Sequence, residues 1–507
     1  MGIQLNPLVR LRRDRGRILI YRVDPVLRLV DKHGFIPPLS AILLSLFDGT
    51  RGSHEVLTDF SYLLGDGEPA AGPDTVVLSK GERAAAEGGG SPGRYLAGLP
   101  EEELRGRVAS FATTILSSVG RVFGADLLVP VNGSGPRLDM DPFDYVMDPK
   151  EVDISPRDGR LVAPLEINYV VTHACPRRCL YCYAETYLAP RLDLLPLDRV
   201  EAVAREAGRL RVNAMYLSGG DPFARKEILE IVRLLVANRV PPFLSTKSHL
   251  KRRTCDRLRE LGIEHMQVSL DAADEALADE LTGSRGFYRE ILETLDNLQA
   301  LGIRVRVKAV VTSRNLRAIP GLLEYLAGRG VRAIQLSGYG RSVYRHADTL
   351  FPGNDDLAWL ADQTRAFATA HPEVALVLSN VQPRPPITPE LKRRTWAGRS
   401  ACSAGRTAMT VLPDGKVTIC DQLPSEPTYY LGDLARQSIL EVWNSERVQR
   451  FLLPSREELA GTACFSCPDF EDCHRLKSRC LRDVYNVFRD ARNPDPACPR
   501  SGIDVRI

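Results

Sequence analysis

The pattern of hydrophobic positions changes along this chain from helical spacing to an alternation of strands and helices. Near the start, RILIYRV and VLRLVD predict two short strands, and two apolar stripes at helical spacing follow within residues 39–64. Residues 65–98 are rich in Gly, Ala, Pro and Ser and predict a mobile linker. An amphipathic helix is predicted over about residues 100–123, and its apolar face consists of Leu104, Val108, Phe111, Ile115, Val119 and Phe123.

A second pattern begins near Pro164 and continues to about Ser337. Six apolar segments alternate there with helical stretches: EINYVV, NAMYLS, FLSTK, HMQVSL, RVRVKAVV and AIQLSG. This spacing predicts an α/β fold with a parallel sheet or partial barrel, whose ligands bind at the carboxyl ends of the strands. Several polar or small residues lie at such strand ends, namely Cys175, Gly219, Gly220, Thr246 and Ser269. After Ser337 the alternation fades.

Composition and charge limit the class of protein. The chain has 507 residues, 44% hydrophobic and 26% charged, so it can bury a core and is too long for one ordinary domain. Its 67 basic and 64 acidic residues leave a formal charge of +3, which predicts no nucleic-acid partner and no membrane partner. No signal peptide is visible, and the apolar stretch at residues 39–47 is too short to span a membrane. These features predict a cytoplasmic protein.

The cysteines are distributed very unevenly: the first is Cys175, and seven of the eleven lie after residue 400. In a reducing compartment, clustered thiols are typical of metal or redox sites rather than disulfides. The segment THACPRRCLYCYAE brings Cys175, Cys179 and Cys182 together directly after the first of the six strands. Three thiolates leave one iron of a [4Fe-4S] cubane free for a substrate or cofactor, and a zinc site is the alternative. Cys255 is better explained as an ordinary helix cysteine.

This cysteine segment resembles the motif of the radical S-adenosylmethionine (SAM) superfamily, Cys-x3-Cys-x-aromatic-Cys, with Tyr181 at the aromatic position. The resemblance implies a partial (β/α)6 barrel in which SAM chelates the open iron and one electron cleaves it to a 5′-deoxyadenosyl radical. LSGGDP resembles the GGE-type turn of the family, with aspartate in place of glutamate. The SAM-binding residues implied in this way are Tyr181, Gly219, Gly220, Asp221, Thr246 and Ser269. Lys308 could reach a SAM carboxylate, but a strand lysine is more often a solvated residue of the outer face.

The tail resembles the SPASM domain, an extension of many peptide-modifying radical SAM enzymes that usually holds two auxiliary [4Fe-4S] clusters. By this resemblance, the nearer cluster is held by Cys402, Cys420 and Cys480, and the farther cluster by Cys464, Cys467, Cys473 and Cys498. Six residues separate Cys473 from Cys480, where the family usually has three. The nearer cluster then has only three thiolates, and its fourth position is either open or taken by a carboxylate, a histidine or water.

The N-terminal segment resembles a PqqD-like peptide-recognition element, a small winged-helix fold of three strands and three helices. The segments that carry this resemblance are RILIYRVDPVLRLVD, FIPPLSAILLSLFDGT and SHEVLTDFSYLL. It implies that a leader peptide adds as a strand to a sheet edge. A DNA-binding winged helix is the alternative, but the near-neutral charge and the acidic residues Asp48, Glu55 and Asp59 argue against it.

The patterns together divide the chain into five parts: a PqqD-like domain at 1–65, a linker and bridging helix at 66–160, a radical SAM partial barrel at 161–345, a connecting segment at 346–400 and a SPASM domain at 401–507. They predict a radical SAM oxidoreductase, a maturase that abstracts hydrogen from a ribosomally made precursor peptide and installs a crosslink such as a thioether. The implied cofactors are SAM, one SAM-binding [4Fe-4S] cluster and two auxiliary clusters.

The implied partners are the precursor with its leader and a flavodoxin- or ferredoxin-like electron donor. A radical SAM enzyme of cofactor or tetrapyrrole maturation, and a non-catalytic iron-sulfur electron-transfer or regulatory protein, are the alternatives. The sequence points to no catalytic base.

Overall fold

The structure is a computed structural model. It describes residues 2–24, 28–64, 101–124, 126–131, 138, 140–147, 150–152, 160–184, 193–344, 347–384 and 387–503. The chain divides into two compact units, Met1–Arg157 and Asp158–Ile507. The linker predicted at residues 65–98 lies outside the described residues. Within the described ranges, no helix has both the length and the apolar character that a bilayer crossing requires.

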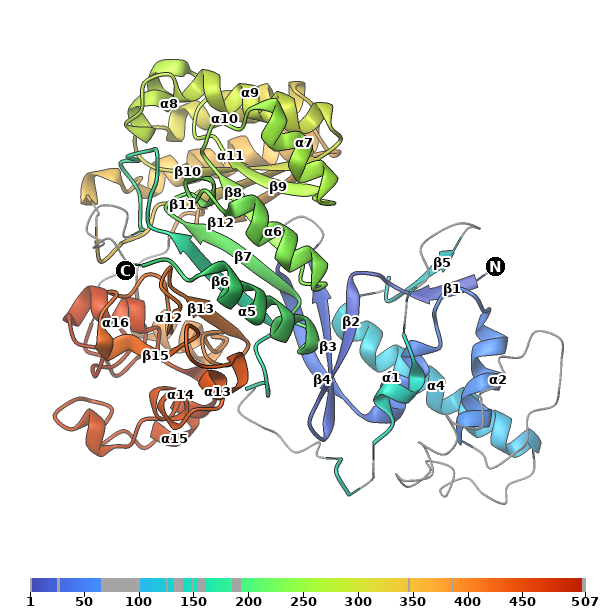
Figure 1. The fold of residues 1–507 in the computed structure, drawn as a ribbon. Coiled ribbons are helices and arrows are strands. Elements are labelled where there is room, and N and C mark those ends of the chain that lie inside the picture. Colours follow the sequence, from blue (N-terminus) through green and yellow to red (C-terminus); the bar gives the residue numbers. More distant parts are fainter. Residues whose placement is uncertain are drawn as a thin grey trace. The chain divides into compact units, whose positions relative to one another are not determined.

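The first unit contains a three-stranded antiparallel sheet in the order β2 (Val9–Asp14), β3 (Arg17–Val23) and β4 (Val30–Ile36) (Figure 1). A second antiparallel pair joins β1 (Gly2–Leu5) to β5 (Leu128–Val131). Helices α1 (Pro38–Ser45), α2 (Ser53–Leu64) and α4 (Glu101–Phe123) share one apolar core with these strands. Because α4 packs against α2, it belongs to this unit.

Three details of this unit differ from the sequence prediction. The second predicted strand begins too early, because Asp24 and Leu29 close a turn through their backbone and β4 starts at Val30. Strands β1 and β2 were not predicted at all, since their short segments carry little apolar character. On α4, Phe111 is 42% exposed rather than part of a buried stripe, although its ring stacks on Phe60 with centroids 6.4 Å apart.

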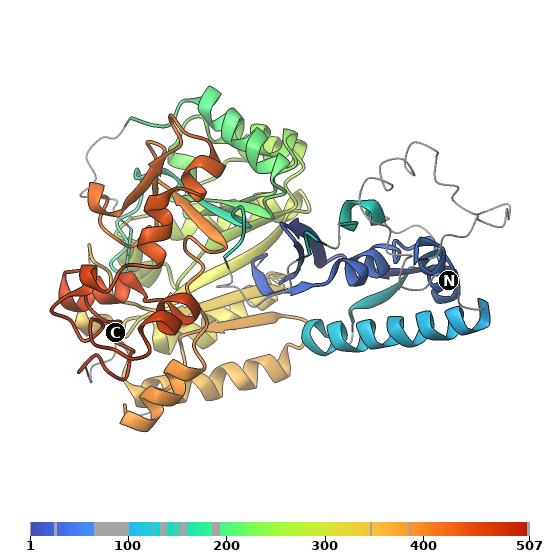
Figure 2. The same cartoon turned by 90° about the horizontal axis from the view of Figure 1, so that it is seen from below.

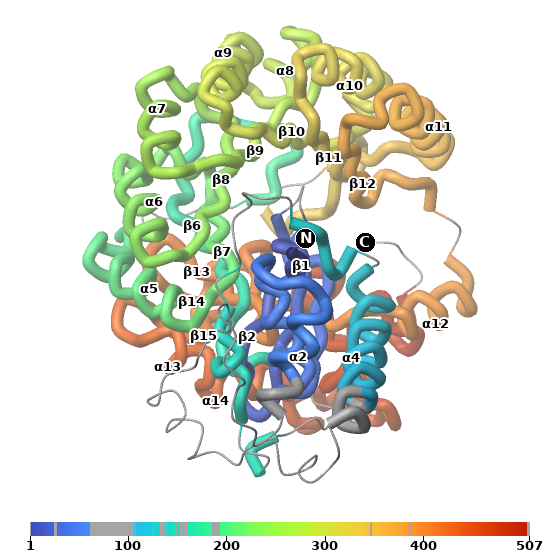
Figure 3. Tube along the Cα trace, turned by 90° about the vertical axis from the view of Figure 1, so that its right-hand side faces the viewer, coloured from blue at the N-terminus to red at the C-terminus, as the bar shows by residue number. Residues whose placement is uncertain are grey.

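The second unit is built on one continuous sheet. The six strands predicted from the sequence follow one another as parallel neighbours: β6 (Glu166–Thr172), β7 (Ala214–Gly219), β8 (Pro242–Thr246), β9 (His265–Ser269), β10 (Arg304–Val311) and β11 (Ala333–Gly338). The helices between them are α5 (Leu197–Arg209), α6 (Ile228–Ala237), α7 (Arg252–Glu260), α8 (Glu275–Thr282), α9 (Phe287–Ala300) and α10 (Ile319–Gly328). Figure 3 shows these helices along the outer side of the curved sheet. The predicted partial barrel of α/β class is confirmed.

The sheet extends beyond the six predicted strands on both sides. Helix α11 (Asn354–Ala370) and strand β12 (Ala375–Ser379) add a further parallel unit within the segment predicted as a connection. On the other side, β13 (Ala408–Val411) pairs in parallel with β6, and β14 (Lys416–Thr418) and β15 (Tyr430–Asp433) continue the sheet in antiparallel order.

The remaining helices lie toward the carboxyl terminus. They are α12 (Pro389–Ala397), α13 (Ile439–Trp443), α14 (Glu446–Leu452), α15 (Phe470–Asp472) and α16 (Leu481–Phe488). Figures 1 and 2 show the chain after β15, coloured orange-red to red, gathered beside β13–β15. The cysteine-rich tail is therefore attached to the barrel through a shared sheet.

Candidate active site and cluster sites

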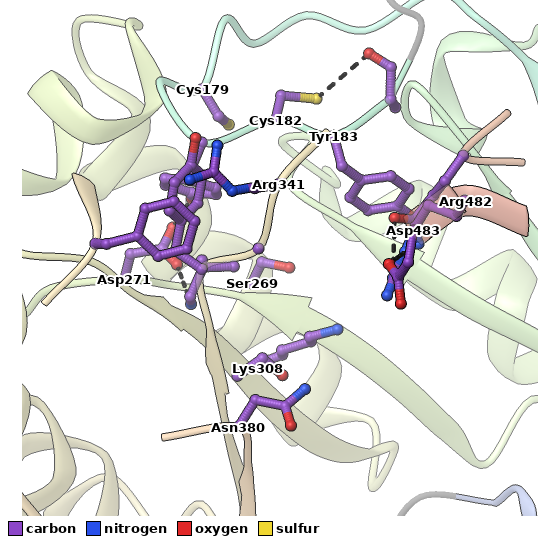
Figure 4. A pocket seen from close by; sticks show the side chains of 18 of the residues that line it. Cys179, Cys182, Tyr183, Ser269, Asp271, Lys308, Arg341, Asn380, Arg482 and Asp483 are labelled. Carbon is purple, nitrogen blue, oxygen red and sulfur yellow. Dashed lines mark hydrogen bonds and ion pairs between the residues drawn. The ribbon is translucent and has the colours of Figure 1, made fainter. Parts of the chain in front are cut away.

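A cavity of about 870 Å³ opens at the carboxyl ends of the parallel strands in the second unit (Figure 4). The loop after β6 lines it with the thiols of Cys175, Cys179 and Cys182. All of the residues that the sequence analysis assigned to SAM also line it: Tyr181, Gly219, Gly220, Asp221, Thr246 and Ser269. The cavity thus brings together the elements of the predicted SAM site, and their contacts with SAM stay a prediction.

The two glycines hold the cysteine loop against the end of β7. The backbone N–H of Gly220 donates to the carbonyl of Thr172 at 2.8 Å, and that of Asp221 donates to the carbonyl of Ala174 at 2.9 Å. A Cβ atom at Gly220 would lie 2.2 Å from the Ala174 oxygen, and Gly219 has a φ of +138°. A side chain at Gly220 would therefore clash with the cysteine loop, and the φ of Gly219 favours glycine.

Asp221 and Thr246 are engaged with each other. The buried Asp221 carboxylate accepts the Thr246 hydroxyl at 2.9 Å and the backbone N–H groups of Lys247 and Phe223 at 2.7 and 3.0 Å. Burial raises the pKa of Asp221, and these donors oppose that effect. The pair therefore ties the ends of β7 and β8 together as one wall of the cavity.

Tyr181 lies in a buried polar cluster that the sequence analysis did not foresee. Its hydroxyl donates to Asp271 and accepts from Lys247, while the Lys247 Nζ lies 2.6 Å from the Asp271 Oδ2. Burial and the Asp271 charge raise the pKa of Tyr181, so the phenol keeps its proton. Lys247 is the last residue of the predicted segment FLSTK, and Asp271 directly follows HMQVSL. Their positions at strand ends are the one signal that could have identified them.

Lys308 corrects one expectation. The sequence favoured a solvated outer-face position, whereas Lys308 points into the cavity between Ser269 on β9 and Gln335 on β11, with which it is in register. Burial lowers the pKa of Lys308, and the charges of Arg306 and Lys247 lower it further. Both faces of a barrel strand are shielded from solvent, so period-two alternation alone does not tell inside from outside.

Other polar side chains of the cavity belong to residues to which the sequence analysis assigned no role. These are Tyr183, Arg341, Asn380, Arg482 and Asp483 (Figure 4). Arg482 and Asp483 follow Cys480 in the tail and form an ion pair at 2.8 Å. One end of the cavity wall is therefore built by the tail rather than by the barrel.

The seven tail cysteines form two groups. Cys402, Cys420 and Cys480 line one small cavity of about 50 Å³. In the second group, burial and the neighbouring thiols of Cys464, Cys467 and Cys498 raise the pKa of Cys473 to about 12. These groups correspond to the ligand sets expected for the nearer and the farther cluster, and ligation itself stays a prediction. Cys255 lies fully buried in the barrel core, apart from both groups.

The thiols fit iron-sulfur clusters better than single metal ions. Among the residues that the structure describes, no three Cys, His, Asp or Glu side chains converge as ligands of one ion. A cubane binds its thiolates at separate corners and therefore accepts ligands that are farther apart. Burial also raises the pKa of Cys175 and of Cys480 to about 12, and a bound metal would favour the thiolate at either position.

The fold and these thiol groups define an α/β-barrel protein of the iron-sulfur class. Residues 169–344 match the model of the radical SAM superfamily, and residues 402–468 match SPASM, an iron-sulfur cluster-binding domain. The chain therefore carries a radical SAM domain followed by a SPASM domain. Both resemblances seen in the sequence, and with them SAM and iron-sulfur clusters as cofactors, are confirmed; the PqqD-like character of the N-terminal segment stays a prediction.

Several relatives align over most of the chain. The PqqA peptide cyclase of Methylobacterium sp. (strain 4-46) is 25% identical over 360 residues, which cover 68% of this chain and 89% of the relative. The PqqA peptide cyclase of Bradyrhizobium diazoefficiens is 28% identical over 357 residues, with coverages of 68% and 88%.

A solved structure resembles the whole chain. SuiB of Streptococcus suis matches over 98% of this chain and 99% of its own, with a TM-score of 0.58 and 15% identity. SuiB has also been solved bound to S-adenosylmethionine and bound to the precursor peptide SuiA. At this identity, the likeness shows a shared fold.

Proposed function

We propose that this protein is a radical SAM peptide maturase, an oxidoreductase that abstracts hydrogen from a ribosomally made precursor peptide and installs a crosslink. The observation that carries the proposal is the large cavity at the strand ends, where the three-cysteine loop faces polar residues of both the barrel and the tail. The relatives named PqqA peptide cyclase support a peptide substrate, and so does the likeness to SuiB, which was solved with a precursor peptide.

The residues of the cavity have different proposed roles. Cys175, Cys179 and Cys182 would hold the first cluster, and SAM bound there supplies a 5′-deoxyadenosyl radical when it is reduced. Lys308 offers a buried positive charge that a SAM or peptide carboxylate would neutralise. Tyr181, fixed by the Lys247 and Asp271 pair, keeps the cysteine loop in place.

The first unit offers a site for the leader. Among the described strands, β2 and β4 are the outermost strands of the three-stranded sheet. The outermost strand of a sheet is where an extended peptide can add. The exposed residues Asp31, Lys32 and His33 lie on β4. We propose that a leader adds to one of these edges and so raises the local concentration of the core peptide at the cavity.

Two further parts of the proposal follow from chemistry. Reductive cleavage of SAM needs one electron, for which we propose a flavodoxin- or ferredoxin-like donor. All eleven cysteines are free thiols, which supports a reducing, cytoplasmic location. A thioether is one of the crosslinks that this radical chemistry can give.

The test compares the whole chain with a chain that lacks residues 1–157, the first compact unit. The peptide to be offered to both proteins is the product of any short reading frame found beside the gene. After anaerobic reconstitution and reduction, we expect both proteins to form deoxyadenosine, whereas the shortened chain modifies the precursor at least tenfold more slowly. Free leader peptide added to the whole chain should compete with the precursor, and a scrambled leader should not.

The outcomes separate the alternatives. Equal modification by both chains would refute the leader role of the first unit. Deoxyadenosine without any peptide product, together with turnover of a small molecule, would favour cofactor or tetrapyrrole maturation. A whole chain with full clusters and no SAM cleavage would be a non-catalytic iron-sulfur protein.

A further inference from the structure

We propose that the Nε2 atom of His474 is the fourth protein ligand of the nearer auxiliary cluster, beside Cys402, Cys420 and Cys480. The inference rests on the iron-sulfur character of the SPASM domain and is independent of the reaction on the peptide. Three thiolates alone would leave one iron without a protein ligand. The sequence pattern does not decide what occupies that position.

His474 lines the same small cavity as the three thiols. The other polar side chains of that cavity are Ser478, Arg479 and Arg482. Arginine has no lone pair to offer a metal, and the Ser478 hydroxyl accepts the backbone N–H of Cys402 at 2.9 Å. No carboxylate lies among the described residues that line this cavity. His474 is therefore the side chain there with the chemistry of an iron ligand.

The nearby carboxylates have other partners. Asp421 follows Cys420 and accepts from the Asn168 amide at 3.3 Å and from the Cys420 thiol at 3.9 Å, but it is absent from the wall of the small cavity. Asp483 pairs with Arg482 and lines the large cavity instead. Neither carboxylate lines the small cavity, whereas His474 does.

The hydrogen bonds of the imidazole leave a lone pair directed at no protein atom. His474 Nδ1 lies 2.9 Å from the carbonyl oxygen of Phe470, and because a carbonyl only accepts, Nδ1 carries the proton. Nε2 then has the lone pair, yet it is buried without a hydrogen-bond partner, and the residue is only 4% exposed. A buried polar atom without a partner is costly. A metal-bound histidine has this same arrangement, with its second nitrogen donating to a carbonyl.

The local backbone explains how His474 reaches this place. Cys473–Lys477 forms one wide π-helical turn, and Ser478 then has a φ of +55°, so the six residues between Cys473 and Cys480 are not a regular helix. The Phe470 ring packs against the imidazole at an interplanar angle of 41°, with ring centroids 4.4 Å apart. Arg406 donates to the His474 carbonyl at 2.6 Å. The additional residues relative to the family spacing thus hold an oriented histidine, and π turns are frequent at functional sites.

The experiment uses pulsed EPR on the reduced, reconstituted full-length chain. To remove overlap with the first cluster, Cys175, Cys179 and Cys182 are replaced by Ala in every sample. We expect a ¹⁴N hyperfine coupling of directly bound imidazole, which changes to the ¹⁵N pattern when histidine is isotopically labelled. His474→Ala should lose this coupling, and the control His371→Ala, at a partly exposed histidine paired with Glu324, should keep it.

A second variant keeps the test decisive if His474→Ala assembles poorly. His474→Cys supplies a thiolate in place of the imidazole and should retain iron, lose the nitrogen coupling and lower the midpoint potential of one cluster, because an anion replaces a neutral ligand. Added cyanide should change the spectrum of His474→Ala but not that of the parent.

One result would overturn the inference. The parent protein would contain iron for two auxiliary clusters, show no ¹⁴N coupling and change its spectrum when cyanide is added. One iron of the nearer cluster would then be open and not bound by His474. This result would leave the peptide function intact. Conversely, a nitrogen coupling in a protein that modifies no peptide would refute the proposed function and support the histidine ligand.

Discussion

Lys247 and Asp271 form a buried ion pair beside the three-cysteine loop, with Nζ and Oδ2 2.6 Å apart. Lys247 directly follows β8, and Asp271 lies just beyond β9. The second Asp271 oxygen accepts the backbone N–H of Val310 on β10 at 2.8 Å. The pair thus joins three strand ends to Tyr181 on the cysteine loop.

Replacing one partner of this ion pair should lower the unfolding free energy more than replacing both partners. Asp271→Ala leaves a buried cation and deprives Tyr181 of its acceptor, so we expect a loss of about 3–5 kcal/mol in unfolding free energy. The double variant Lys247→Met with Asp271→Leu should lose less. Denaturant unfolding, monitored by tryptophan fluorescence, measures the stability of the single and the double variant. Glu230→Ala is the control, because Glu230 is exposed and its loss should change stability little. A double variant less stable than Asp271→Ala would contradict the expectation.

A methyl group at Gly220 should displace the cysteine loop. Its Cβ would meet the carbonyls of His173 and Ala174 at 2.5 and 2.2 Å, so Gly220→Ala forces the loop away from β7. We expect a cost of about 1–3 kcal/mol and a loss of SAM cleavage. The matched control is Gly321→Ala in α10, where nothing lies within 4 Å and helix propensity should improve. Equal deoxyadenosine formation by the two variants would refute the role given to Gly220.

Lys308 should make the binding of SAM depend on pH. Burial and the neighbouring charges lower the pKa of Lys308, so the amine loses its proton at a lower pH than an exposed lysine. A carboxylate prefers the protonated amine, and SAM affinity should fall as the pH rises through this lowered pKa. Lys308→Met should bind SAM about tenfold more weakly, or about 1.4 kcal/mol, without that pH dependence. Calorimetric titration at several pH values tests it, and Lys226→Met, at an exposed position, should behave as the parent does.

Features that depend on a short stretch of sequence could be predicted, whereas contacts between distant residues could not. The six barrel strands were predictable because each is a short apolar run set between helical segments. Strand β12 was missed, since ALVLS is five residues long and only half-buried. Lys247 and Asp271 follow different strands, so no local sequence pattern could predict the ion pair between them. The same holds for His474, whose neighbours in space are cysteines from distant parts of the tail.

The three cysteines after β6 should be needed for SAM cleavage but not for assembly of the auxiliary clusters. Replacing Cys175, Cys179 and Cys182 by Ala should abolish deoxyadenosine and remove about four irons per chain, because the tail binds its clusters separately. Iron and sulfide analysis after anaerobic reconstitution gives the count. Cys255→Ala is the control, since this thiol is buried in the barrel core, and it should change neither value. Undiminished deoxyadenosine in the triple variant would overturn the site.

The tail cysteines should account for the rest of the iron. The parent is expected to bind about twelve irons per chain if each cluster is a full cubane, and Cys464→Ala with Cys467→Ala should bind about eight. Deoxyadenosine should still form in this variant, although peptide modification should fall. A plateau near four irons that the double variant does not change would instead indicate a tail without clusters.

The parallel pairing of β6 with β13 has a consequence for synthesis of the chain. Glu166 lies opposite Ala408, so the first barrel strand leaves the ribosome long before one of its two neighbours exists. Until then, β7 covers one edge of β6, and the other edge exposes backbone groups directly before the cysteine loop. Any product that ends before β13 would keep this edge open and be prone to aggregation. Synthesis as far as β13 therefore also covers the open edge of the barrel.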